Sequence, residues 1–124
     1  ALKNISHTLK RMCLGGIFDQ LEGGFFRYSV DDLWMIPHFE KMLYDNGPLI
    51  ELLCKIYRMT SNPIFLKRLK QTSNWLINKM QDEVGGFYSS IDADSEHVEG
   101  KYYVWEREEL ENCKPNLKCK IGIT

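Results

Sequence analysis

The chain has 124 residues, of which 44% are hydrophobic and 27% are charged, a composition typical of one folded domain rather than of a disordered segment. Its formal net charge of −1 and its scattered basic residues argue against nucleic-acid binding, which needs a concentrated positive surface. No apolar run approaches the roughly 20 residues that cross a bilayer and no segment resembles a signal peptide, so we expect a cytoplasmic protein without membrane or nucleic-acid partners.

The first predicted helix lies at the start of the chain. Apolar residues recur there at helical spacing, namely Leu2, Ile5, Leu9, Met12 and Cys13. A left-handed glycine commonly closes a helix, so we expect this one to end at Gly15-Gly16. Residues 15–37 then lose the period and are rich in glycine and aromatic side chains, which favours a structured loop.

A second helix is predicted over residues 38–59. Its apolar stripe begins with Phe39, Met42 and Leu43. On such a helix, His38, Lys41 and Asp45 would share another face, where polar groups could line a cavity. Pro48 lacks a backbone N–H and crowds the preceding turn, so we expect a kink or break there that costs about 3 kcal/mol if unrelieved.

A third helix is predicted from the pair Asn62-Pro63, which fits an N-cap followed by proline at the first helical position. Its apolar stripe continues to about Asp82. Gly85-Gly86 then opens a second loop, over residues 87–104, that is rich in aromatic and acidic residues.

The end of the chain contains a short fourth helix, predicted over residues 105–110 with acids near its positive N-terminal end. The residues that follow are lysine-rich and show no periodicity. We therefore expect a domain of residues 1–112 and an unpatterned tail of residues 113–124.

The cysteines form no C-x-x-C pair and have no histidine at zinc-ligand spacing. Cys13 and Cys54 continue apolar helical stripes, so we expect both to be buried thiols. The acidic run at residues 92–96 resembles a calcium loop, but His97 stands where an EF-hand requires glycine. We expect no metal and no cofactor.

An internal repeat links the two halves of the chain. A helix, Gly-Gly-Ile-Phe at residues 15–18, a long loop and a helix are followed about 70 residues later by the same order with Gly-Gly-Phe-Tyr at residues 85–88. Each unit is a helical hairpin, and such units bury their apolar faces by stacking on neighbours. Two copies are therefore expected to leave an apolar flank uncovered.

Several motifs together resemble one known family. They are Gly15-Gly16-Ile17-Phe18-Asp19-Gln20, Gly23-Gly24-Phe25, Arg27-Tyr28-Ser29, Trp34, the run Pro37-His38-Phe39-Glu40-Lys41-Met42-Leu43-Tyr44-Asp45-Asn46, Gly85-Gly86-Phe87-Tyr88-Ser89, Asp92-Ala93-Asp94-Ser95-Glu96, Gly100-Lys101 and Tyr103-Val104-Trp105. This set is similar to the spermatogenesis-associated protein 20, or YyaL-type, family over about residues 5–110.

The resemblance implies a fold. Full-length members are similar to a thioredoxin-like domain followed by a six-hairpin toroid of the kind found in glycosidases and N-acylglucosamine 2-epimerases. It implies that this chain is all-α and forms a partial (α/α) six-hairpin toroid, with about two helical hairpins and long Gly-rich loops. The chain thus resembles an internal fragment of the toroid.

Three positions depart from the family pattern. Phe26 stands where histidine is expected, Glu22 stands where glycine is usual, and Pro48 lies in a helix that is expected to be continuous. Loss of the histidine removes a group that could act as an acid, a base or a sugar ligand. The tail is what a shifted reading frame or premature stop would leave, so a gene remnant is one hypothesis.

Candidate site residues follow from the expectation that both Gly-Gly loops meet at one end of a toroid cavity. Sugar chemistry there needs groups that move protons and aromatic faces that bind pyranose rings. The candidate catalytic residues are Glu40, His38, Asp92 and Asp94. The candidate substrate-binding residues are Arg27, Tyr28, Trp34, Tyr44 and Asp45.

Each candidate also has a structural alternative. Glu40 could pair with Lys41 or Arg27, because buried polar groups need partners in any protein. Asp92 could brace its own loop through Asx-type bonds to backbone N–H groups. The aromatic residues could serve as packing. The sequence leaves both roles open.

Two functional hypotheses remain. In the first, the parent protein performs acid–base chemistry on a carbohydrate-like small molecule, or binds one, and this chain alone is inactive. In the second, the chain is a non-catalytic interaction or remnant protein that self-associates through the uncovered apolar flank. A monomer that binds sugars would favour the first hypothesis, and a concentration-dependent oligomer would favour the second.

Overall fold

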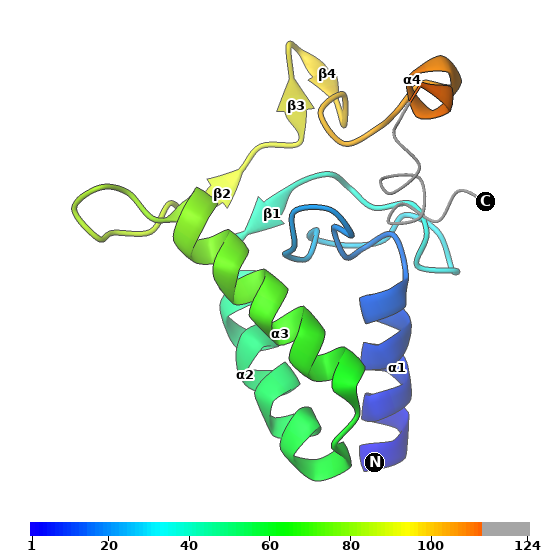
Figure 1. The fold of residues 1–124 in the computed structure, drawn as a ribbon, viewed down its shortest axis with the longest axis vertical. Coiled ribbons are helices and arrows are strands. Elements are labelled where there is room, and N and C mark those ends of the chain that lie inside the picture. Colours follow the sequence, from blue (N-terminus) through cyan, green and yellow to red (C-terminus); the bar gives the residue numbers. More distant parts are fainter. Residues whose placement is uncertain (113–124) are drawn as a thin grey trace.

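The computed structural model describes residues 1–112, in which three long helices stand side by side and the loops collect at one end (Figure 1). The helices are α1 (Leu2–Leu14), α2 (Leu43–Thr60), α3 (Pro63–Trp75), which continues as the π-helix η1 (Leu76–Met80), and the short α4 (Arg107–Glu111). The predicted tail of residues 113–124, with Cys113 and Cys119, lies outside the described residues.

Two small antiparallel sheets accompany the helices. Strand β1 (Lys41–Met42) pairs with β2 (Ser90–Ile91), and β3 (Asp94–Ser95) pairs with β4 (Val98–Glu99). The described residues are about half helical, which confirms the predicted all-α fold only in part, because that prediction missed these two sheets. Strands of two residues are too short to leave a periodic signal in the sequence. No toroid is formed by residues 1–112, and the toroid stays a prediction.

Helix α1 ends where it was predicted to end, but the predicted left-handed conformation of Gly15 is wrong. Gly15 is extended, with φ −88° and ψ −177°, rather than left-handed. A Cβ atom on Gly15 would lie 2.3 Å from the Trp34 carbonyl oxygen, and one on Gly16 would lie 1.9 Å from that of Met35. Glycine is therefore needed because the loop backbone approaches closely, not because a left-handed turn is required.

The start of α2 differs from the prediction by five residues. The helix begins at Leu43, Lys41–Met42 form strand β1, and residues 38–40 are non-helical with a bend at Phe39. Their backbone groups bond to other segments: the Arg27 N–H donates to the Glu40 carbonyl at 2.8 Å, and the His38 N–H donates to the Tyr28 carbonyl at 2.9 Å. These long-range bonds override the helical spacing of the apolar residues.

Pro48 does not break α2, so the predicted break is wrong, while the alternative of a kink stays a prediction. The helix runs through it without interruption from Leu43 to Thr60. Pro48 lies five residues after the helix begins, so its missing N–H removes one bond, to the Tyr44 carbonyl, and leaves the later turns intact.

The third helix begins as predicted. The Asn62 side chain caps it by accepting from the Ile64 N–H at 3.2 Å, and Pro63 occupies the first turn. The helix ends at Met80 rather than near Asp82, and its last turn is the π-helix η1, which was not predicted. The predicted fourth helix exists as α4, which is closed at its start by a capping box between Glu106 and Glu109.

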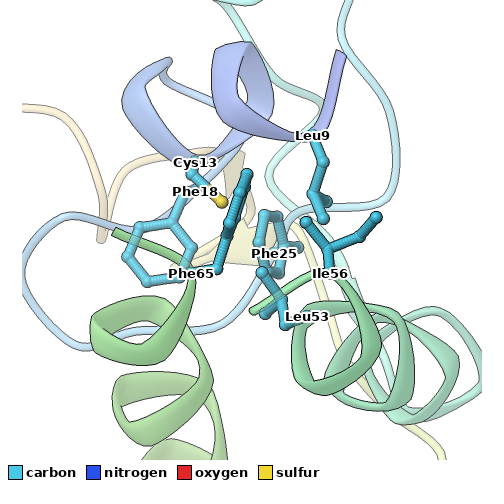
Figure 2. Packing of buried hydrophobic residues seen from close by; sticks show 7 residues of the cluster. All are labelled: Leu9, Cys13, Phe18, Phe25, Leu53, Ile56 and Phe65. Atoms are coloured by element: carbon cyan, nitrogen blue, oxygen red, sulfur yellow. The ribbon is translucent and has the colours of Figure 1, made fainter. Parts of the chain in front are cut away.

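The main core joins all three long helices to the first loop (Figure 2). Its buried residues are Leu9 and Cys13 from α1, Phe18 and Phe25 from the loop, Leu53 and Ile56 from α2, and Phe65 from α3. Cys13 is buried as predicted, and burial raises the pKa of its thiol to about 12. Cys54 is exposed, so its predicted burial is wrong. The α2 stripe through Leu53 and Ile56 turns Cys54 away from the core.

The two Gly-Gly loops lie at the same end of the helices because β1 and β2 join them (Figure 1). Strand β1 ends the first loop, and β2 follows the second Gly-Gly pair. None of the helices in residues 1–112 is long and apolar enough to cross a membrane.

Candidate functional site

The segment of residues 38–42, here called the site strand, bends at Phe39 and ends in β1, and it separates polar from core-facing side chains. His38 and Glu40 lie within 3.4 Å of each other on one side. Phe39 and Lys41 both contact the Tyr103 ring on the other side. The predicted helical face that combined His38 with Lys41 is therefore wrong, because these residues are not helical and the two side chains have different surroundings.

His38 lies between two carboxylates. Its Nδ1 atom is 2.8 Å from Oε1 of Glu99, and its Nε2 atom is 3.4 Å from Oε2 of Glu40. The Tyr28 ring stacks on the imidazole with centroids 4.9 Å apart and planes inclined by 13°. We call His38, Glu40, Glu99, Tyr28 and Arg27 the His38 cluster.

Arg27 holds Glu40 in place. Its guanidinium Nη1 donates to Oε2 of Glu40 at 3.1 Å, which confirms one of the two pairings considered for Glu40. The bond to Glu40, together with the nearby Tyr44, raises the pKa of Arg27. The cluster thus gathers four of the predicted site residues, Arg27, Tyr28, His38 and Glu40, and a fifth, Tyr44, lies beside Arg27.

Asp45 lies next to this cluster, in the first turn of α2. Its Oδ2 atom is buried and has no hydrogen-bond partner in the described part of the chain. Burial raises the pKa of Asp45, Arg27 opposes the increase, and Glu40 adds to it. Asp45 is therefore a carboxyl group whose surroundings favour the protonated form.

Asp45→Asn is expected to stabilise the protein at neutral pH and not at acid pH. Because the folded-state pKa of Asp45 is raised, the folded state binds more protons than the unfolded state, so stability falls as pH rises from the ordinary Asp value of about 3.9 through the folded-state value. Since the carboxyl is partly solvated, the gain at pH 7 should be on the order of 0.5 kcal/mol. Urea unfolding at pH 3, 5 and 7 measures it.

The exposed Asp32→Asn replacement is the matched control for the loss of one carboxylate and should change stability by less than about 0.5 kcal/mol. A loss of stability in Asp45→Asn that grows from pH 3 to pH 7 would mean instead that ionised Asp45 is a favourable partner of Arg27.

A groove of about 550 Å³ adjoins the His38 cluster. Its lining residues are Met12, Ile17, Arg27, Tyr28, Ser29, Asp31, Asp32 and Trp34. Trp34 is left-handed, with φ 62°, a conformation that costs about 1 kcal/mol in a non-glycine residue. Its carbonyl accepts from the Gly16 N–H at 2.6 Å, so the glycine pair holds this loop in place. Trp34 thus lies at the groove, beside two other predicted binding residues.

Asp92 and Asp94 lie elsewhere. They line a separate cavity of about 250 Å³ with Glu22, Lys79 and Tyr102 among its walls, and neither His38 nor Glu40 reaches it. The Asp92 Oδ1 atom accepts from the Asp94 N–H at 3.2 Å, which is the Asx-type bond considered as its structural role. Within residues 1–112, no group of three or more histidine, cysteine or acidic side chains is placed to hold a metal ion.

Glu22, a departure from the family pattern, has a defined partner in this second cavity. Its Oε1 atom accepts from the Tyr102 hydroxyl at 2.6 Å. That bond and burial raise the pKa of Tyr102. The glutamate therefore fixes one wall of the cavity.

The Lys41 side chain is fully buried on the interior side of the site strand. Its ammonium donates to Oδ2 of Asp19 at 2.7 Å and to the Gly23 carbonyl at 2.9 Å. The rings of Phe26, Trp75 and Tyr103 surround it, with centroids 5.1, 4.8 and 5.2 Å away, respectively. We call these side chains, with Asp19, the Lys41 cage. Burial lowers the pKa of Lys41, and the Asp19 carboxylate opposes this.

Sequence reasoning missed the roles of Glu99 and Asp19. Glu99 is 61 residues from His38, and no local signal joins them. Phe26, where a histidine was expected, lies in the Lys41 cage and not in the His38 cluster. The expected loss of an acid or base at that position therefore does not affect the groups around His38.

Comparison with known proteins places these residues in context. No protein-family model matches the chain. Spermatogenesis-associated protein 20 of Rattus norvegicus is 39% identical over 115 residues, and that of Homo sapiens is 38% identical over 115 residues, each alignment covering 88% of this chain and 15% of the relative. An uncharacterised protein of Caenorhabditis elegans is 38% identical over 114 residues, or 86% of this chain and 16% of the relative. The resemblance predicted from the motifs is confirmed: the chain is similar to one segment of spermatogenesis-associated protein 20 and spans about 15% of the length of these curated mammalian relatives.

Proposed function

We propose that the groove and the His38 cluster bind a carbohydrate-like small molecule, and that Glu40 and His38 move a proton at the bound molecule. The observation that carries this proposal is the imidazole held between two carboxylates, 2.8 and 3.4 Å away, at the edge of a groove with aromatic walls. Because the chain spans about 15% of its mammalian relatives, the reaction of the whole protein is also a proposal.

The groove has the chemistry that sugar binding needs. Trp34 and Tyr28 supply aromatic faces, on which the C–H faces of a pyranose can pack. Ser29 and Asp32 supply polar groups beside them that can bond to hydroxyls. A shallow groove with a few convergent polar groups is a usual form of small-molecule site.

Proton transfer is assigned to the Glu40–His38 pair. Their facing atoms are 3.4 Å apart, so an approach of a few tenths of an ångström brings them within the distance for direct proton transfer. Glu99 occupies Nδ1 of His38 and thereby orients the ring, while Arg27 fixes Glu40. Asp92 and Asp94 line the other cavity, so we do not include them in this step.

We propose the six-hairpin toroid as the architecture of the longer relatives. The remaining hairpins would then close the open groove and supply the rest of the reaction site. This chain alone is expected to bind the small molecule without turning it over, because an open groove does not exclude water.

A specific surface favours self-association as a second candidate function. The loop before the site strand exposes Val30, Leu33, Met35 and Ile36 by 56 to 65% of their surface. Neighbouring exposed apolar side chains mark protein–protein contacts more often than isolated ones do. This loop is the strongest candidate for the uncovered apolar surface expected from the sequence.

One experiment separates the two functions. Sedimentation velocity over a range of protein concentrations is followed by an NMR titration with neutral mono- and disaccharides. We expect a monomer with saturable shifts of the Trp34 and His38 signals. Glu40→Gln should weaken binding about tenfold, because a lost charged hydrogen bond costs about 1.5–3 kcal/mol.

The control is Glu51→Gln, which removes an exposed carboxylate on α2 and should leave binding unchanged. A folded monomer that responds to no saccharide contradicts the proposed function. A concentration-dependent oligomer that dissociates in Leu33→Ser supports the second candidate.

A further inference from the structure

We infer that the groove selects uncharged and positively charged sugars and rejects phosphorylated sugars and sugar acids. The inference rests on the proposed function and names the substrate class of the same site. It comes from the charges that the lining residues present and from which of those charges already have partners.

Carboxylates dominate the groove and its edge. In the part of the chain that the structure describes, Arg27 is the only basic residue among those that line it. Asp31 and Asp32 line the same groove, and Glu40 lies beside Arg27 at 3.1 Å. The groove and its edge therefore carry three carboxylates and one guanidinium, and the summed field of these groups repels an anion.

Arg27 is already paired with a carboxylate. Proteins recognise phosphate and carboxylate groups with guanidinium groups that bond to two ligand oxygens at once. Here Oε2 of Glu40 accepts from Nη1 of Arg27 at 3.1 Å. The Glu40 carboxylate offsets the charge of Arg27, so an anion that bound at the remaining N–H donors would gain less from the guanidinium.

Asp31 is kept ionised by its own loop. Its Oδ1 atom accepts from the Ile36 N–H at 2.9 Å, from the Ser29 hydroxyl at 2.7 Å and from the Met35 N–H at 3.0 Å. These bonds, led by that of Ile36, lower the pKa of Asp31. A protonated Asp31 that could donate to an anion is therefore disfavoured.

Asp32 is the group available to a positively charged ligand. It lines the groove, is exposed, and has no hydrogen bond or ion pair within residues 1–112. An ammonium group on a sugar would find this carboxylate next to the Trp34 ring, and both attract cations. An amino sugar is thus the best fit, and a neutral sugar is tolerated.

The test compares sugars that differ mainly in charge. The chain is titrated by NMR with N-acetylglucosamine, glucosamine, glucose 6-phosphate and glucuronate at low ionic strength and in 1 M salt. We expect both anions to bind at least about tenfold more weakly than N-acetylglucosamine at low ionic strength. The difference should shrink in 1 M salt, where the Debye length is about 3 Å.

A pair of variants assigns the effect to the groove. Asp32→Asn should reduce the preference for glucosamine over glucose 6-phosphate. Glu83→Gln makes the same change in net charge on the loop after η1, on the opposite side of the molecule (Figure 1), and should leave that preference as it is.

The outcomes are distinct. If no sugar binds, the proposed function fails and the inference fails with it. If anions bind as tightly as N-acetylglucosamine, the inference is wrong while the proposed function stands. An equal effect of both variants also overturns the inference, because net charge rather than the groove would then set the preference.

Discussion

Lys41→Met is expected to lower the free energy of unfolding by about 3–5 kcal/mol, the usual cost of removing one partner of a buried ion pair. The change would leave the Asp19 carboxylate, which is only 7% exposed, without its ammonium partner. It would also remove the cation from the rings of Phe26, Trp75 and Tyr103. Urea unfolding followed by circular dichroism measures the loss.

Two further variants make this result interpretable. Lys55→Met breaks an exposed pair with Glu51 and should change stability by less than about 1 kcal/mol. Asp19→Asn combined with Lys41→Met should recover part of the loss, because the amide oxygen can still accept from the backbone N–H groups of Leu21 and Glu22. If Lys41→Met were as mild as Lys55→Met, the Lys41 cage would contribute little to the fold.

Asn46→Ala is expected to lower the free energy of unfolding by at least about 3 kcal/mol. The buried Asn46 side chain pairs with the Phe25 backbone as a neighbouring strand would. Its Oδ1 accepts from the Phe25 N–H at 2.7 Å, and its Nδ2 donates to the Phe25 carbonyl at 3.0 Å. A second bond from its Nδ2 reaches the Met42 carbonyl at 3.0 Å. Truncation leaves these buried backbone groups unpaired, at about 1–3 kcal/mol for each group.

The measurement is urea unfolding together with hydrogen exchange at the Phe25 amide, which should lose its protection in the variant. Asn74→Ala, at an exposed position on α3, is the matched control and should stay within about 0.5 kcal/mol of the parent chain. Retained protection of the Phe25 amide in Asn46→Ala would show that another group pairs with it.

The helices were predictable because their signals are local. The apolar stripes of α1 and α3, the Asn62-Pro63 start and the glycines after α1 all act within a few residues, and the structure has these features where the sequence predicts them. The η1 turn was not predictable, because a π-helix has the composition of an α-helix.

The site strand shows why local signals fail. Residues 38–42 have apolar spacing suited to a helix, but their backbone bonds to residues far away in sequence, at Tyr28, Arg27 and Ile91. Those partners are known only once the chain has folded. The types of side chain that gather around His38 could therefore be predicted from the sequence. That Asp92 and Asp94 lie in a separate cavity could not.

Neighbouring side chains of the site strand lie on opposite sides, so ligand binding at Glu40 depends on a rigid backbone held by Lys41. Glu40 contacts the groove residue Arg27 while its neighbour Lys41 is anchored in the interior, so the backbone at Glu40 cannot shift far unless the buried ammonium gives up Asp19. A ligand that required such a shift would have to supply the free energy of breaking that pair. The groove should therefore bind its ligand without rearranging. The backbone of residues 38–42 should have the same position before and after binding.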